Sequence, residues 1–205
     1  RGNTETHDDV ITREAGIALH EPFHPAKMRR ILQRLNRLNI FARVEEPELF
    51  VSDKGGGILI SVQEGNANTL DGVIGYAPAT SSGESGMVTG FLTVGMRNLF
   101  GTGRRLAVRW QRDGRETQEI AVRYVEPWVA GLPLTASIGL VQRQQDSSYV
   151  QRTLETGTDL LLTEVLSVGL VASFEEVIPS SDVSRPIVAE SHTTAGGVTL
   201  RYDTR

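Results

Sequence analysis

Two kinds of hydrophobic spacing divide the chain near residue 65. Residues 25 to 38 place apolar side chains three and four positions apart, which is the repeat of a helix with one buried face. Beyond residue 68, apolar residues alternate with small or polar ones in one segment after another. Such alternation is typical of β-strands whose two faces meet different surroundings. The sequence therefore predicts a mixed N-terminal module followed by a larger all-β part.

The N-terminal module is predicted to run helix, helix, strand, strand. Thr4 or Thr6 can cap a short helix over residues 7 to 15, and Pro25 suits the first turn of a second helix. After that helix, residues 40 to 45 and 49 to 51 predict an interrupted strand, the three glycines at 55 to 57 a loop, and residues 58 to 62 a last strand.

The second helix is predicted to be amphipathic. Its buried face consists of Met28, Ile31, Leu32, Leu35 and Leu38, and its basic face of Lys27, Arg29, Arg30, Arg34 and Arg37. We expect the basic face to be solvated; the alternative is a contact with anionic lipid headgroups or with a partner protein.

The all-β part is predicted to contain about eight strands. They lie near residues 68 to 78, 87 to 97, 104 to 113, 116 to 126, 132 to 144, 149 to 161, 164 to 176 and 190 to 204. On one face they carry Leu106, Val108, Trp110, Ile120, Val122, Tyr124, Leu134, Ala136, Ile138, Leu140, Leu166, Val168, Leu170, Ala172, Phe174, Val198, Leu200 and Tyr202.

Alternation fits a soluble β-sandwich as well as a membrane barrel. The second face favours the barrel, because it consists of Gly, Ser, Thr and Ala with an occasional Arg, which suits a narrow polar lumen. There, Arg109, Arg123 and Arg201 are expected to pair with Glu119, Asp159 or Asp203. The connections between strands also alternate in length, as the short periplasmic turns and longer external loops of membrane barrels do. The tight turns are at 98–103, 127–131 and 161–163, and the polar links are at 79–86, 113–116, 145–148 and 177–189.

Composition narrows the possibilities further. With 39% hydrophobic residues and 21 glycines, the chain is too apolar for a disordered segment. A net charge of -4 argues against a nucleic-acid binder, and the lack of cysteine excludes disulfides and cysteine-based zinc sites. The most apolar run, residues 160 to 174, is shorter than the ~20 residues of a membrane-spanning helix. The start at Arg1 suggests a processed precursor or the interior of a longer protein.

Motifs for catalysis and metal binding are weak. Gly101 and Gly103 are expected to be turn residues with positive φ, since no third glycine and no helix follow them as a dinucleotide loop requires. His20 and His24 have a zinc-like spacing, but prolines at 22 and 25 prevent the helix that would bring them together. Residues 83 to 86 lack the spacing of a nucleophile elbow. We therefore predict no enzyme activity, no cofactor and no metal.

Several stretches, in order, resemble the BamA-like outer-membrane insertases of the bacterial surface antigen superfamily, which combine POTRA domains with a sixteen-stranded barrel. They are Gly2–Thr6 with Val10, Ile11, Arg13 and Glu14; Leu35–Val44; Ile60–Gly65; Gly72–Tyr76; Asn98–Gly103; and Glu126, Pro127 and Trp128 with Gly131.

The resemblance implies a fold and two domains. Residues 1–66 would be an α+β C-terminal POTRA domain without its first strand. Residues 67–205 would be the N-terminal half of an antiparallel transmembrane β-barrel, unless they close as an eight-stranded barrel of their own. The family's Arg-Gly-aromatic motif in the sixth external loop is absent.

The resemblance also implies a function: insertion of β-barrel clients into the bacterial outer membrane, with the POTRA module in the periplasm. The first barrel strand would form a lateral gate, with Leu70, Gly72, Val73, Ile74, Gly75 and Tyr76; fitting a tight bend is the structural alternative for its glycines. Periplasmic turns would contain Asn98, Gly101, Gly103, Pro127 and Gly131. Partners would be unfolded clients, outer-membrane lipid and accessory assembly lipoproteins. A passive transporter of the two-partner secretion type and a soluble β-rich binding module remain as alternatives.

Overall fold

The computed structural model describes residues 1–17, 25–52, 55–79, 85–145, 149–163, 165–179 and 188–202. The chain divides into two compact units. Unit 1 comprises residues 1–69 together with the short segment 96–104, and unit 2 comprises residues 70–95 and 105–205.

Unit 1 is an α+β module. Its elements are helices α1 (Asp8–Ala15) and α2 (Pro25–Arg37) and strands β1 (Phe41–Val44), β2 (Glu48–Ser52), β3 (Gly55–Leu59) and β4 (Val62–Glu64). β1 pairs antiparallel with β4, and β2 pairs antiparallel with β3. The predicted order of helix, helix, strand and strand is therefore confirmed. The first predicted strand is divided into β1 and β2, as its predicted break implies, and the second is divided between β3 and β4.

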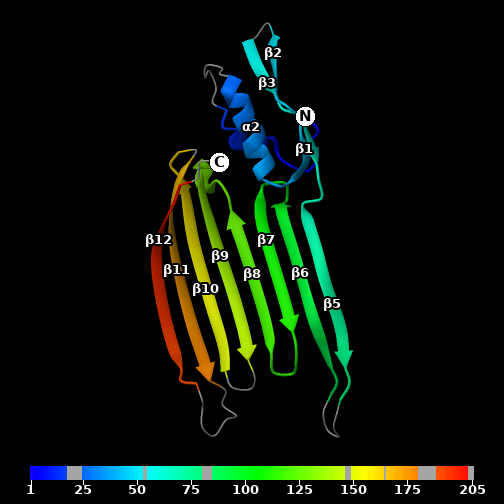
Figure 1. Cartoon of the computed structure of the whole chain (residues 1–205), viewed down its shortest axis with the longest axis vertical. Coiled ribbons are helices and arrows are strands. Elements are labelled where there is room, and N and C mark those ends of the chain that lie inside the picture. The colour runs from blue at the N-terminus through cyan, green and yellow to red at the C-terminus, as the bar shows by residue number, and fades with distance from the viewer. Residues whose placement is uncertain are drawn as a thin grey trace. The chain divides into compact units, whose positions relative to one another are not determined.

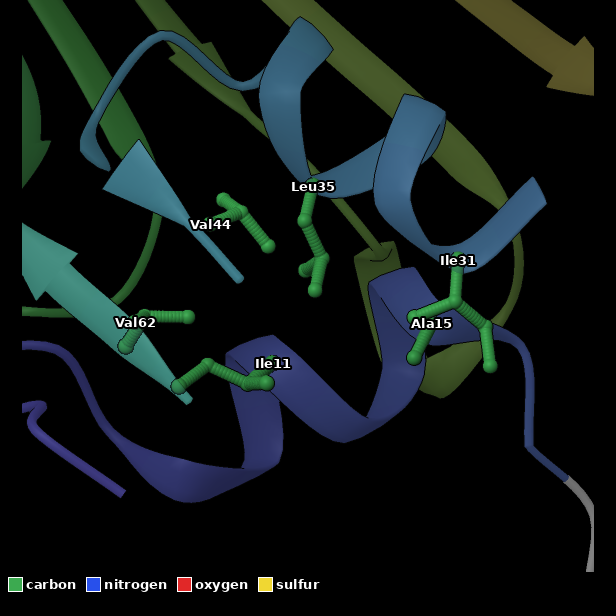
Figure 2. Packing of buried hydrophobic residues seen from close by; sticks show 6 residues of the cluster. All are labelled: Ile11, Ala15, Ile31, Leu35, Val44 and Val62. Carbon is green, nitrogen blue, oxygen red and sulfur yellow. The ribbon is translucent and has the colours of Figure 1, made fainter. Parts of the chain in front are cut away.

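The core of unit 1 lies between the two helices and the β1–β4 pair. Figure 2 shows the side chains that meet there: Ile11, Ala15, Ile31, Leu35, Val44 and Val62. Ile31 and Leu35 are fully buried, and Met28, Leu32 and Leu38 pack against the cluster. The predicted buried face of α2 is thus confirmed. On its basic face Arg29, Arg30 and Arg37 are exposed, whereas Lys27 and Arg34 are partly buried.

Two local predictions in unit 1 are wrong. Helix α1 begins after His7 with no side-chain cap, because Thr4 and Thr6 hydrogen-bond to Glu64 instead. The three glycines do not form a loop but belong to β3, opposite Phe50, Val51 and Ser52. A Cβ at Gly57 would lie 2.4 Å from a carbon of the Phe50 ring, so glycine is what allows the ring to cover this strand.

Unit 2 is built on an eight-stranded antiparallel sheet, which confirms the predicted fold class (Figure 1). Its strands are β5 (Asn68–Ala77), β6 (Met87–Leu99), β7 (Arg104–Arg112), β8 (Gln118–Glu126), β9 (Leu134–Gln145), β10 (Tyr149–Leu161), β11 (Leu166–Pro179) and β12 (Ser191–Tyr202). Each strand neighbours the next one along the chain, and β5 and β12 are the outermost strands. Within the described ranges, the sheet does not close on itself.

The connections follow the predicted positions. A short turn joins β6 to β7, and a 3-10 turn, η1 (Val129–Gly131), lies between β8 and β9. The positive φ expected for Gly101 and Gly103 is observed, at 71° and 76°. Among the described helices, neither has the length and apolar character needed to cross a membrane.

Candidate functional site

Cross-strand register gives the eight-stranded sheet two chemically different faces. Residues directly opposite one another in neighbouring strands share a face. Val122 lies opposite Leu140, Leu140 opposite Leu154, and Leu154 opposite Phe174. We call this side the apolar face: it contains the even-numbered residues of β7 to β12, as alternation predicted.

Within the described residues, no second layer of protein covers the apolar face. Leu170 is 59% exposed, Val198 73% and Leu200 72%. In a water-soluble sandwich these side chains would pack against another sheet. A contiguous exposed apolar surface of this kind marks a region that contacts a membrane or another protein.

The opposite side, with the odd-numbered residues, is the small-residue face. Gly139 and Gly169 on it are buried. Arg143 donates to Glu119 Oε2 over 2.9 Å from Nε and 2.7 Å from Nη2. Arg123 reaches across Gly139 to within 3.9 Å of Glu155 Oε2.

Inward charge pairing was predicted, but the partners differ from those expected. Glu119 pairs with Arg143, which lies directly opposite it in register, and Arg123 pairs with Glu155 on a strand two away. Asp203 lies outside the described residues. Sequence alternation placed these charges on one face, whereas the pairs depend on the register between strands.

Strand β5 carries the six residues singled out for a gate: Leu70, Gly72, Val73, Ile74, Gly75 and Tyr76. It lies at one edge of the sheet, with β6 as its neighbour on one side. All six residues are exposed. An edge strand presents backbone N–H and C=O groups that another strand can pair with. A gate at this position remains a proposal.

The β5 glycines also have a packing role. A Cβ at Gly72 would lie 2.6 Å from the Phe91 carbonyl oxygen, and one at Gly90, where φ is 130°, would lie 1.9 Å from the Val73 oxygen. At Gly75 the nearest atom, Thr89 Oγ1, would be 3.3 Å away. Glycine is therefore required at positions 72 and 90 for β5 and β6 to approach each other this closely. The need for glycine at position 75 is much smaller.

The turn between β6 and β7 belongs to unit 1. Asn98 Oδ1 accepts a hydrogen bond from the Gly103 N–H (2.8 Å), and Asn98 Nδ2 donates to Thr6 Oγ1 (2.8 Å). The Gly101 carbonyl accepts from the His7 N–H (2.9 Å), and the Thr102 carbonyl from Arg13 Nη2 (2.7 Å). The structure thus connects Asn98, Gly101 and Gly103 through one hydrogen-bonded turn.

Pro127 and Gly131 lie in the separate connection between β8 and β9. Gly131 has a φ of 76°, and its N–H donates to the Trp128 carbonyl over 3.0 Å. These two residues thus belong to a different connection from the one that contains Asn98.

Glu64, at the end of β4, holds the N-terminal segment in place. Its carboxylate accepts hydrogen bonds from the backbone N–H groups of Thr4 (2.9 Å), Glu5 (2.8 Å) and Thr6 (2.5 Å), and from Thr4 Oγ1 (2.6 Å). Burial raises the pKa of Glu64, but hydrogen bonds from Thr4, Thr6 and Glu5 outweigh it and lower the pKa to about 2. The sequence pattern carried no signal for this residue.

Replacing Glu64 by Gln is expected to loosen residues 4 to 6, because charge-assisted hydrogen bonds are lost. The cost is about 1–3 kcal/mol, toward the lower end since the carboxylate is only partly buried. The depressed pKa means that the stabilisation is complete above about pH 4.5 and is lost as the pH falls toward 2.

Hydrogen exchange of the Thr4 to Thr6 amides measures this effect. At pH 7, exchange is predicted to be faster in Glu64→Gln than in the unmodified protein. Gln63→Ala is the control, because it changes the exposed neighbouring residue of β4 and should leave the exchange rates as they are. Equal rates in all three proteins would contradict the assigned role of Glu64.

Metal binding finds no support in the described residues, where no group of three or more His, Cys, Asp or Glu side chains is arranged to hold an ion. His20 and His24 lie outside the described residues, as does part of the segment from 83 to 86.

Comparison with known proteins adds three findings. Residues 1–65 match the POTRA family model, described as a surface antigen variable number repeat. Over 122 residues the chain is 35% identical to the outer membrane protein assembly factor BamA of Nitratidesulfovibrio vulgaris, a match that covers 58% of this chain and 14% of that protein.

The third finding concerns the fold. The crystal structure of BamA from Haemophilus ducreyi lacking POTRA domains 1–3 superposes with a TM-score of 0.58 and 15% identity, over 100% of this chain and 43% of that one. The chain thus spans less than half of either relative.

Proposed function

We propose, from the similarity of this chain to BamA, that it is part of an outer-membrane protein assembly factor that folds and inserts β-barrel clients. Residues 1–66 are its POTRA domain, which receives unfolded clients in the periplasm. Residues 67–205 are the first half of its barrel. This proposal is supported by the relative from Nitratidesulfovibrio vulgaris, which is named an assembly factor. The role that we propose is not an enzymatic one.

The observation that carries the proposal is the uncovered apolar face of unit 2. A sheet with this face in lipid and small, charge-paired residues on the other is typical of a transmembrane barrel. Backbone groups in lipid must be satisfied by neighbouring strands, so an edge such as β5 requires a partner strand there. That partner is the last strand of the parent barrel or, during assembly, a strand of the client.

The energy for insertion comes from the client. Each client strand that pairs with β5 satisfies its own backbone N–H and C=O groups and transfers apolar side chains from water to lipid. Burial of apolar surface contributes about 25 cal/mol per Å², so no nucleotide hydrolysis is required. Accessory lipoproteins that deliver clients are further proposed partners.

The test uses the full-length parent protein. It is expected to require detergent for extraction, to migrate differently on a gel when unheated, and to accelerate insertion of an unfolded outer-membrane protein into liposomes. A parent that dissolves without detergent would contradict the proposal. A detergent-dependent parent that conducts polypeptides but does not speed insertion would identify the passive transporter instead.

A further inference from the structure

Leucines gather where the apolar face reaches the turns of the sheet. Leu134 on β9 lies opposite Leu160 on β10, and beyond β10 the Leu162 N–H donates to the Leu166 carbonyl of β11 over 2.9 Å. In the connection between β8 and β9, Leu132 is 55% exposed, and Leu162 is 53% exposed. We call these five residues the leucine end of the sheet.

The two connections at the leucine end are hydrogen-bonded to each other. The Leu161 N–H donates to the Pro133 carbonyl over 3.0 Å, one step beyond the last pair of β9 and β10. Because neighbouring strands are antiparallel, the β8–β9 and β10–β11 connections fall at the same end of the sheet. The leucine end is therefore one continuous surface. Glu164, in the second connection, lies outside the described residues.

The other end of the same face is polar. Residues of four neighbouring strands form a row there: Gln142, Arg152, Glu176 and His192. Three threonines also interrupt the face between its two ends: Thr156, Thr158 and Thr194. A hydroxyl costs far less in an apolar medium than an ion does, so threonine does not bound the apolar surface as the charged row does.

The length of the face depends on the leucine end. Leu166 to Phe174 on β11 covers eight residue steps, or about 27 Å along the strand. A strand tilt of about 40° reduces this to a height of about 21 Å, whereas the apolar band of a membrane barrel is about 25 Å tall. Leu132 and Leu162, beyond the ends of β9 and β10, supply the missing height.

Backbone groups at the leucine end are satisfied without water. The N–H groups of Leu162 and Thr163 both donate to the Leu166 carbonyl, over 2.9 and 3.1 Å. Thr163 Oγ1 accepts from the N–H groups of Val165 (3.4 Å) and Leu166 (3.1 Å). In the neighbouring connection, Pro133 has no N–H group. Backbone groups that lie in hydrocarbon must be satisfied within the protein, and these N–H groups meet that condition.

The same saturation favours acyl chains over a protein partner as the occupant. Protein interfaces contain about one hydrogen bond per 100–200 Å². The five leucine side chains have no donor or acceptor, and the N–H groups of the β10–β11 turn listed above are already engaged. Lipid hydrocarbon requires no such groups.

Tyrosines flank the leucine end on the strands to either side. On β8, the Tyr124 hydroxyl donates to the Glu126 carboxylate, which bounds the apolar surface there. On β12, Tyr202 lies opposite Leu166. Tyrosine is enriched at the interface between membrane and water, because its ring is apolar and its hydroxyl is polar. Between these two strands, leucine stands where an aromatic girdle would otherwise be expected.

We propose that the leucine end is immersed in the acyl chains of the membrane leaflet that faces the periplasm. The β8–β9 and β10–β11 connections then lie below the headgroups, while Tyr124 and Tyr202 lie at the interface on the outer strands. The hydrocarbon thus extends further toward the turns at β9 to β11 than beside them. This inference rests on the proposed function, because it requires the apolar face to lie in a bilayer with these turns toward the periplasm.

The test measures the depth of single cysteines that carry an environment-sensitive fluorophore. The full-length parent, freed of other cysteines, is inserted into phosphatidylcholine vesicles that contain a lipid with a nitroxide quencher on its headgroup or near the start of its acyl chain. The label at Leu162→Cys is expected to be quenched about twofold more by the acyl-chain nitroxide than by the headgroup nitroxide, because it lies within the hydrocarbon core. Leu132→Cys reports on the neighbouring connection and is expected to behave in the same way.

Two further variants serve as controls. Ser167 lies opposite Leu161, at the same level of the sheet but on the small-residue face. The label at Ser167→Cys should be quenched by iodide in the water rather than by either lipid. Gln142→Cys marks the polar end of the apolar face and should respond more to the headgroup nitroxide. The gel shift of unheated protein establishes that each variant is folded.

Stronger quenching of both turn labels by the headgroup nitroxide or by iodide would overturn the immersion. Protection of both labels from all three quenchers would show that protein covers the leucine end, and would overturn it as well. If either result came with normal client insertion, only this inference would fail. A parent soluble without detergent would overturn the proposed function itself.

Discussion

If the apolar face lies in lipid as proposed, Leu170→Arg is expected to destabilise the protein in a bilayer by about 2–4 kcal/mol, the cost of a cationic side chain near the middle of a strand that faces lipid. Val171→Arg, one residue further along β11, is expected to cost much less. Leu170 is 59% exposed and Val171 47%, so neither site is filled by packed protein. The two positions differ in the face to which they belong.

The pair of variants is compared by urea unfolding of the full-length parent in lipid vesicles. A third variant, Leu170→Gln, separates the cost of charge from that of polarity. If Leu170→Arg and Val171→Arg lowered stability equally, the assignment of the apolar face to lipid would be contradicted.

The second large effect is expected in β5. Gly72→Val places a branched side chain against the Phe91 carbonyl, where even a Cβ would lie 2.6 Å away, so the pairing of β5 with β6 is expected to fail and client insertion with it. Gly75→Val meets only Thr89 Oγ1 at 3.3 Å, and the protein is expected to fold. Because glycine weakens a strand by roughly 0.5–1 kcal/mol, this change stabilises β5 and should slow client insertion about two- to fivefold.

Insertion rates into liposomes and the gel shift of unheated protein are measured together for both variants. Folded Gly75→Val with slowed insertion supports a gate that depends on a weak strand. If Gly75→Val folds and client insertion proceeds at an unchanged rate, the glycines have a packing role alone. That result would contradict the proposal that β5 forms the gate.

Alternation along the chain was sufficient to predict the faces of the sheet. Successive residues of a strand point to opposite sides of the sheet. The apolar residues from Leu106 to Tyr202 therefore share one face only if even-numbered residues of neighbouring strands lie opposite one another. The observed register has this arrangement in β7 to β12. The helical repeat of α2 predicted the burial of Ile31 and Leu35 for the same reason, since periodicity is a local property.

Contacts between distant residues could not be predicted in this way. Glu64 accepts hydrogen bonds from backbone groups about sixty positions away, and backbone donors leave no mark in a sequence. The same contacts engage Thr4 and Thr6, which explains the wrong prediction of a helix cap. Gly57 was assigned to a loop because its place beneath the Phe50 ring depends on strand pairing.

The proposal that the sheet faces lipid is tested most directly by a scan of single cysteines along residues 166 to 174 of β11, in a parent freed of any other cysteine; this chain contains none. Each cysteine is spin-labelled in vesicles, and its accessibility to oxygen, which concentrates in lipid, is compared with that to a water-soluble nickel complex. Even-numbered positions are predicted to favour oxygen and odd-numbered positions the nickel complex. Accessibility without this two-residue period, or with the opposite phase, would contradict the placement of the apolar face in the membrane.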